Sequence, residues 1–151
     1  MSNFKDMWFQ CETIIHSQVT LKEKMQAICN FLGIQMPAYD WVGFYLSDVK
    51  NKKLYLGPFY GEPTEHTSIS YGKGVCGQAA EAQKTFVIDD VTKEENYIAC
   101  SIHVKSEIVV PIVKDQIVVG QIDIDSHIPA AFKEEDQKLL EKICRELAIY
   151  I

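Results

Sequence analysis

The residues best suited to chemistry are two cysteines and three carboxylates in the second half of the chain. Cys76 follows a glycine-punctuated turn, and Cys100 lies in a loop-like segment just before the first of the acids. The acids Glu107, Asp123 and Asp125 lie in a strand-rich stretch. A cysteine thiolate is a nucleophile, and a carboxylic acid can donate a proton or hold a cation. The pattern therefore suggests thiol chemistry assisted by acids.

The stretch 106–126 is predicted to form a β-hairpin, because two apolar runs flank a short polar turn. Side chains alternate between faces along a strand, and opposed residues of an antiparallel pair share a face. The apolar sets of the two strands coincide only if Val113 lies opposite Ile117, across a three-residue loop. A two-residue loop would reverse the register and bury the acids.

In this register the three acids gather on one face of the hairpin. Glu107 lies opposite Asp123, and Asp125 lies on the same side. Three acids on a partly apolar sheet face are costly unless they meet a ligand, a proton or a partner. Spacing alone leaves a second interpretation, in which the acids form a solvated face and the nearby cysteines have no chemical role.

The remaining cysteines are expected to be structural. Cys11, Cys29 and Cys144 lie on the apolar stripes of predicted helices, where a free cysteine behaves as a small buried hydrophobe. Cys76 is expected near a helix N-terminus, where the helix dipole favours a thiolate. Five cysteines without a secretion signal argue against a disulfide framework and make the cytoplasm the default location.

The composition limits the kinds of partner. The 151 residues suit one domain, 1–151, and 47% hydrophobic residues are ordinary for a globular protein. A net charge of −6 without any basic run argues against nucleic-acid binding, and no apolar run reaches membrane-spanning length. No Cys-x-x-Cys or paired-histidine motif indicates a metal, since His66, His103 and His127 are scattered in loops and expected to face solvent.

The elements that must position these residues alternate between helices and hairpins. The expected order is a helix at 3–17, a second from 21 to about 33, strands at 41–46 and 53–59, a loop at 60–71, a small-residue helix entered through 71–82, a strand at 85–88, the hairpin at 106–126 and a last helix from about 133. Because hairpins dominate, the prediction is an α+β fold with a largely antiparallel sheet and helices packed on it.

Six short motifs, in matching order, resemble those of free methionine-(R)-sulfoxide reductases, which are GAF-domain enzymes. They are Trp41-Val-Gly-Phe-Tyr, Leu56-Gly-Pro-Phe, Gly72-Lys-Gly-Val-Cys-Gly, Ile98-Ala-Cys, Ser106-Glu-Ile-Val-Val-Pro and Ile122-Asp-Ile-Asp-Ser. The resemblance extends to about residue 136, with the flanking helices also expected of the family. It implies a GAF-like fold, a largely antiparallel six-stranded sheet with helices packed against it.

The resemblance also implies a reaction. In the family, a cysteine thiolate attacks the sulfoxide sulfur of free methionine sulfoxide and becomes a sulfenic acid. A resolving thiol then forms a disulfide, which thioredoxin reduces. Cys100 matches the attacking residue. The scheme implies thioredoxin as a protein partner and no cofactor.

The same resemblance suggests how the substrate is held. Glu107, Asp123 and Asp125 match the acids that bind the ammonium group and help to protonate the sulfoxide oxygen. Trp41 and Tyr45 match the aromatic wall around the methyl sulfoxide, although on sequence alone they also suit core positions. We therefore expect the three acids to converge on one pocket with both aromatic residues.

The chain departs from the family pattern at one place. Many members carry a further, resolving cysteine just after the Leu-Gly-Pro-Phe segment, where this chain reads Gly61-Glu-Pro-Thr-Glu-His-Thr. Three alternatives follow: Cys76 resolves Cys100, an external thiol does so, or the chain is a non-catalytic GAF module that binds a small molecule or acts as a sensor. A homodimer through the terminal helices is compatible with each of them.

Overall fold

The protein folds as one antiparallel sheet with helices on both faces. The computed structural model describes residues 3–95, 97 and 102–151. The helices are α1 (Phe4–Ile15), α2 (Leu21–Gln35), α3 (Gly74–Ala82) and α4 (Glu134–Leu147), with short 3-10 helices η1 (Val91–Lys93) and η2 (Ala148–Tyr150). The strands are β1 (Trp41–Asp48), β2 (Lys53–Tyr60), β3 (Ser68–Ser70), β4 (Phe86–Ile88), β5 (Ser106–Lys114) and β6 (Ile117–Ser126).

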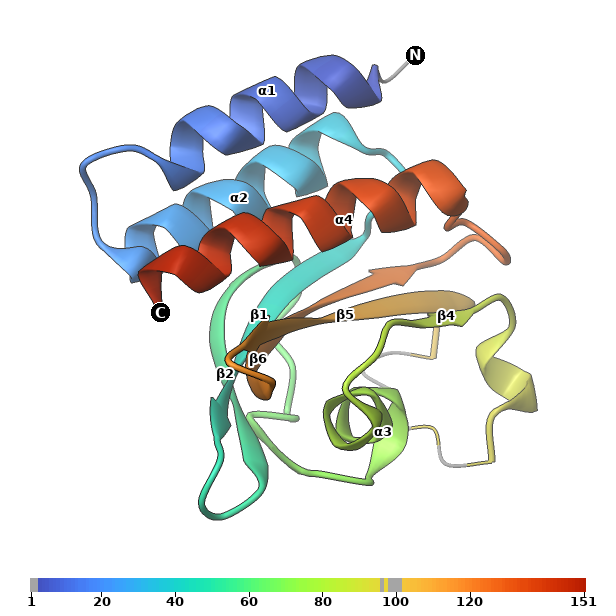
Figure 1. Ribbon diagram of the computed structural model, residues 1–151. Coiled ribbons are helices and arrows are strands. Elements are labelled where there is room, and N and C mark those ends of the chain that lie inside the picture. The colour runs from blue at the N-terminus through green and yellow to red at the C-terminus, as the bar shows by residue number, and fades with distance from the viewer. Residues whose placement is uncertain (1–2, 96, 98–101) are drawn as a thin grey trace.

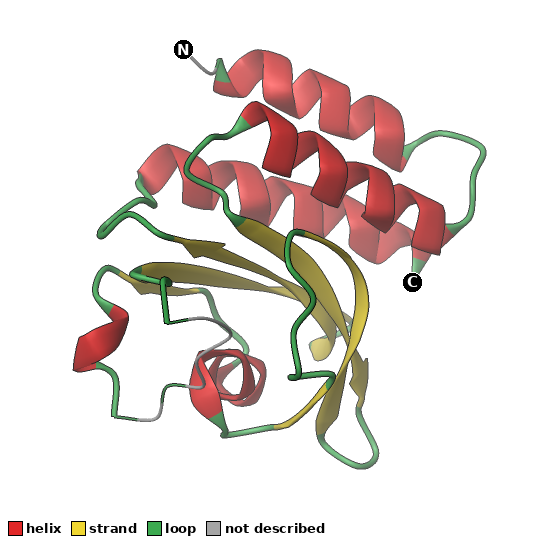
Figure 2. Ribbon diagram, turned by 180° about the vertical axis from the view of Figure 1, so that it is seen from behind, coloured by secondary structure: helices red, strands yellow, loops and turns green. Residues whose placement is uncertain are grey.

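The strands form a six-stranded sheet in the order β3-β2-β1-β6-β5-β4, and all neighbours are antiparallel. The helices α2 and α4 lie on one face of the sheet with α1 packed on them, and α3 lies on the other face (Figure 1). The view from behind also shows the sheet between the two groups of helices (Figure 2). The predicted α+β fold with an antiparallel sheet is confirmed. One local prediction is wrong, since the segment 60–71, expected to be all loop, contains β3.

The three-helix layer covers the larger core. The Thr20 hydroxyl accepts a hydrogen bond from the backbone N–H of Glu23 at 3.2 Å and so caps α2. The thiols of Cys11, Cys29 and Cys144 are buried in this core among the apolar side chains of α1, α2, α4 and the sheet. Among the helices of the described residues, none is long and apolar enough to span a membrane.

The β5–β6 hairpin has a register that differs from the predicted one. Its turn has two residues, Asp115 and Gln116, with φ values of 52° and 67°. Positive φ at both central positions is typical of a type I′ turn, whose twist matches that of the strands. A β-bulge follows, because the pairing shifts between Ile112 and Val113 and leaves Val119 as an extra residue of β6.

The bulge explains why the acids still share a face. Glu107 pairs with Asp125, and Asp123 pairs with Val109, so the predicted pairing of Glu107 with Asp123 is wrong by two residues. A shift of two residues leaves each side chain on its original face. Before the bulge the face reverses, so that Val118, expected on the face opposite the acids, packs in the cluster around α3 on the acid-bearing face.

Candidate functional site

The acids lie on the sheet face that α3 covers. Across β1, β6 and β5, the residues Trp41, Asp125 and Glu107 form one row of opposed positions. Asp123 lies two residues away along β6, opposite Gly43 of β1. All three acids are buried, with exposed fractions of 5% for Glu107 and 1% each for Asp123 and Asp125. The alternative of a solvated acidic face is therefore wrong.

Helix α3 brings a thiol over these acids. A Cβ atom at Gly77 would lie 2.4 Å from the backbone oxygen of Ser70, so only glycine lets α3 lie this close to the end of β3. The Gln121 side-chain amide of β6 donates a hydrogen bond to the backbone oxygen of Cys76 at 2.9 Å. These contacts fix the first turn of α3, with Cys76, against the acid-bearing face.

Cys76, Glu107 and Asp123 form one buried cluster. The Cys76 sulfur and one oxygen of each carboxyl group all lie within 4.8 Å of one another. Asp123 is hydrogen-bonded to the Glu107 carboxyl group and to the Cys76 thiol. Burial raises the pKa of Asp123 above its usual value, although these two hydrogen bonds act in the opposite direction. Asp123 is thus more readily protonated than an exposed aspartate.

The environment of Cys76 disfavours a thiolate. Burial raises its pKa well above the usual value, and the negative charges of Asp123, Glu107 and Asp125 raise it further. The predicted position near a helix N-terminus is observed, since Cys76 lies in the first turn of α3. The predicted consequence is wrong, because the helix dipole contributes only about 0.3–1 kcal/mol, less than burial beside several acids.

The two aromatic residues hold the segment that links β2 to β3. The Trp41 indole N–H donates to the backbone oxygen of Glu62 at 3.0 Å, and the Tyr45 hydroxyl donates to that of His66 at 2.9 Å. The Trp41 ring also stacks on Phe59, with centroids 5.8 Å apart. Both aromatic residues are buried in the α3-side core, so they are core residues and neighbours of the acids at once.

Two pockets open beside the acid face, where a single pocket was predicted. The inner one is narrow, about 10 Å³, and the outer one holds about 380 Å³. The inner pocket is lined by Tyr45, His66, Ile69, Lys73, Gly74, Val75, Cys76, Glu107 and Asp123. The outer pocket is lined by Trp41, Glu62, Pro63, Thr64, His103, Val104, Asp125 and His127. Each pocket thus has one of the predicted aromatic residues and at least one acid.

Sequence reasoning missed several residues of these pockets. His66, expected to face solvent, is half-buried and lines the inner pocket, whereas His103 and His127 are exposed but line the outer one. No local motif marks these histidines, because loops bring them to the site. Cys100, the predicted nucleophile, lies outside the described residues.

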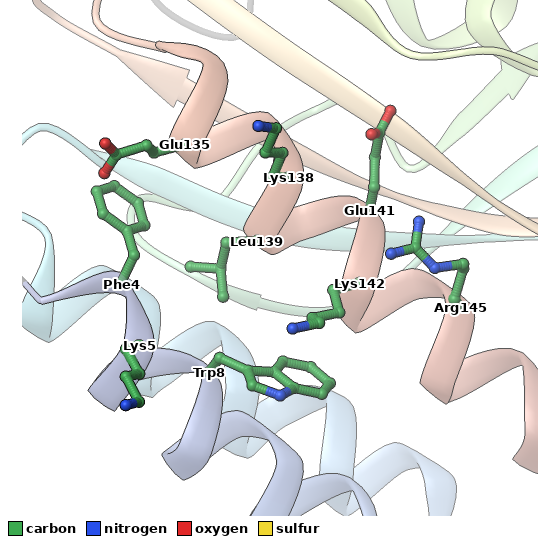
Figure 3. A pocket seen from close by; sticks show the side chains of 9 residues that line it. All are labelled: Phe4, Lys5, Trp8, Glu135, Lys138, Leu139, Glu141, Lys142 and Arg145. Atoms are coloured by element: carbon green, nitrogen blue, oxygen red, sulfur yellow. The ribbon is translucent and has the colours of Figure 1, made fainter.

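A larger concave surface lies between α1 and α4, on the opposite face of the sheet, with a volume of about 650 Å³. Figure 3 shows Phe4 and Trp8 of α1 facing Leu139 of α4, with the Lys142 side chain over the Trp8 ring. Its lining contains neither a cysteine nor a histidine. The buried cluster of a thiol and two acids lies on the α3 side instead.

Cysteine reactivity should distinguish Cys100 from the other four thiols. Burial raises the pKa of Cys11 to about 12, and it also raises the pKa values of Cys29, Cys76 and Cys144. Since only the thiolate alkylates, iodoacetamide should label Cys100 at least about tenfold faster than the rest in the native protein. Peptide mass spectrometry measures the five rates, and urea-unfolded protein, in which all five should react alike, is the control. Equal native rates for Cys76 and Cys100 would contradict this expectation.

Comparison with known proteins places these features in context. The GAF domain family matches residues 18–151. GAF domain-containing protein A of Dictyostelium discoideum is 46% identical, over 71% of this chain and 66% of its own length. The free methionine-R-sulfoxide reductase of Saccharomyces cerevisiae is 42% identical, over 70% of this chain and 59% of its own. The chain thus spans somewhat less than two thirds of both curated relatives.

A solved structure matches over almost the whole chain. The free methionine-R-sulfoxide reductase of Neisseria meningitidis, determined in complex with its substrate, superposes with a TM-score of 0.93 at 32% identity. The match covers 99% of this chain and 91% of that one. The similarity therefore includes α1 and the sheet face that carries the acids.

Proposed function

Because the chain belongs to the GAF domain family and resembles free methionine-R-sulfoxide reductases in sequence and fold, we propose that it reduces free methionine-(R)-sulfoxide to methionine. The observation that carries this proposal is the buried group of Glu107, Asp123 and Asp125 beside a cysteine and two aromatic side chains. Acids held away from water suit an ammonium group, because an opposite charge offsets the cost of burying carboxylates.

The proposed reaction uses thiols as the source of electrons. The Cys100 sulfur attacks the sulfoxide sulfur, the sulfoxide oxygen passes to Cys100 as a sulfenic acid, and methionine leaves. A second thiol then displaces water from the sulfenic acid and forms a disulfide. Thioredoxin reduces the disulfide by exchange, in the reducing environment of the cytoplasm. Each cycle thus reduces one sulfoxide to a thioether and oxidises one thioredoxin dithiol to a disulfide.

The acids supply the protons of the first step. An oxygen leaving sulfur must be protonated, and Asp123 with its raised pKa is a suitable acid. The hydrogen bond between Glu107 and Asp123 provides a route by which the proton is replaced. Tyr45 lines the inner pocket and Trp41 the outer one, so each places an aromatic ring beside the acids.

Cys76 is the internal candidate for the resolving thiol. It belongs to the acid cluster and is a free thiol, whereas Cys11, Cys29 and Cys144 are free but lie in the core across the sheet. A disulfide requires Cα atoms within about 7 Å. Cys76 with a high pKa is a slow nucleophile, so the disulfide should form more slowly than the sulfenic acid.

Substrate form gives the direct test. Free methionine-(R)-sulfoxide has an ammonium group for the acids, whereas a methionine sulfoxide inside a peptide has none. In an NADPH-coupled thioredoxin assay we expect turnover of the free amino acid. Turnover of an N-acetylated peptide that contains methionine sulfoxide should be at least about 100-fold lower, because the buried charge pair between the ammonium group and the acids is lost. The (S)-sulfoxide is the matched stereochemical control. Equal rates on the free and peptide forms would overturn the assignment.

A second function is favoured by the sequence of the β2–β3 segment. Residues 61–67 contain no cysteine, and this segment lies against Trp41 and Tyr45, next to the acid face. A chain that lacks this thiol could act as a GAF module that binds a small ligand without catalysis. Mass spectrometry after stoichiometric sulfoxide separates the two functions, because a binding module leaves Cys100 reduced and the sulfoxide intact.

A further inference from the structure

The cluster of Cys76, Glu107 and Asp123 has the composition of a metal site. Its ligand atoms, one sulfur and two carboxylate oxygens, lie within 4.8 Å of one another and are buried. Zn²⁺ binds cysteine sulfur at about 2.3 Å and carboxylate oxygen at about 2.0–2.2 Å, which places ligand atoms about 3.5 Å apart on a tetrahedral ion. Small side-chain movements of about 1 Å would therefore close the three ligands on one ion.

An independent observation points to a missing ligand at this place. Asp123 is 1% exposed, and its Oδ1 atom has no hydrogen-bond partner among the described residues. A buried acceptor without a partner costs free energy, and coordination to a cation removes that cost.

The size and charge of the inner pocket fit an ion. Its volume of about 10 Å³ is close to the space that one water molecule needs, which is enough for a single ion. Lys73 is the one lysine or arginine among the described residues that line it, and this side chain is exposed. Two acids and a thiol thus face one another in the buried part of this pocket.

We propose that Cys76, Glu107 and Asp123 form a binding site for Zn²⁺, with the fourth coordination position open to water. The thiol sulfur favours zinc over Mg²⁺ and Ca²⁺, which prefer oxygen ligands. Coordination releases the proton of the Cys76 thiol, and both carboxyl groups bind as carboxylates, so zinc binding should weaken as the pH falls. This site needs no sulfoxide reaction, and it competes with substrate for the same two acids.

Cobalt(II) provides a spectroscopic test on the reduced, full-length chain. Co²⁺ should bind in a 1:1 ratio and show a thiolate-to-cobalt charge-transfer band, which Zn²⁺ then removes by displacement. Cys76→Ser should abolish the band and weaken Zn²⁺ binding, measured against a chromophoric chelator, by about 100-fold or more. Glu107→Gln and Asp123→Asn should weaken it at least about tenfold, since even loss of an outer-shell partner costs 10–100-fold.

Two control variants test whether zinc binds outside the cluster. Cys29→Ser changes a buried thiol outside the cluster, and His127→Ala removes one of two neighbouring exposed histidines, whose rings lie 5.9 Å apart. Both variants should bind Zn²⁺ like the unmodified protein. Circular dichroism verifies that each variant is folded.

The zinc proposal and the proposed reductase function can fail independently. A wild-type protein whose cobalt complex lacks the thiolate band would overturn the proposal, whatever the variants do. So would zinc binding that persists in Cys76→Ser or disappears in His127→Ala. A protein that binds zinc through Cys76 but reduces no sulfoxide would keep this site and reject the proposed reductase function.

Discussion

Replacing Cys100 with serine is expected to reduce sulfoxide turnover by at least about 10³-fold, because the reaction loses its nucleophile. Replacing Cys76 with serine should have a different effect. The hydroxyl can still donate to Asp123, as the thiol does, so the acid cluster keeps its hydrogen bond. The first step should therefore proceed, and recycling by thioredoxin should slow by about tenfold or more.

Single-turnover experiments without reductant separate the two roles. The unmodified protein and Cys76→Ser should each form about one methionine per chain, and Cys100→Ser should form none. Intact-mass spectrometry should find a disulfide in the unmodified protein and a sulfenic acid in Cys76→Ser. Cys144→Ser is the matched control, because its thiol is buried on the far side of the sheet. If Cys76→Ser recycles at the normal rate, an external thiol resolves Cys100 instead.

Asp123→Asn is expected to lower kcat/KM for free methionine-(R)-sulfoxide by about 100-fold. The amide has the shape of the acid, but it neither donates a proton to the sulfoxide oxygen nor attracts the ammonium group, and general acid catalysis alone contributes 10²–10⁴-fold. Gln121→Glu is unsuitable as a control, since Gln121 fixes α3. Asp136→Asn is better, because Asp136 is a buried acid that caps α4 and accepts from Tyr39. It should change stability and leave the rate constant of the folded enzyme unchanged.

The same substitution should change how stability depends on pH. The folded-state pKa of Asp123 is raised above 3.8, so its contribution to stability is present below about pH 4 and is lost as the pH rises through the raised value. Asparagine has no such loss. The difference in free energy of unfolding between Asp123→Asn and the unmodified protein should therefore move in favour of the variant from about pH 4 to pH 7. Urea unfolding at both pH values measures it. A difference independent of pH would show that Asp123 has no raised pKa.

Much of the fold followed from local patterns. Alternation along β5 and β6 placed Glu107, Asp123 and Asp125 on one face, and the observed register, shifted by two residues, kept them there. The apolar stripes of the helices likewise predicted the burial of Cys11 and Cys29, because a stripe at helical spacing must face the core.

The prediction failed where distant segments meet. The type I′ turn at Asp115 and Gln116 lacks the glycine that usually marks such a turn in a sequence, so the loop length and the bulge were not predicted. His66 lines the inner pocket because its segment is held by the Tyr45 hydroxyl, and the hydrophobic periodicity of the sequence does not predict such a contact between distant segments.

The sequence by itself determined which residue types could react and on which face of the sheet the acids lie, because alternation is a property of the backbone. Only the tertiary structure decided that Cys76 joins Glu107 and Asp123 in one buried cluster. That contact depends on the packing of α3 against the sheet, where Gln121 of β6 binds the backbone oxygen of Cys76 and Gly77 leaves room for the backbone of Ser70. It also reversed the expected state of the thiol, because burial beside acids raises the pKa of Cys76 more than a helix dipole can lower it.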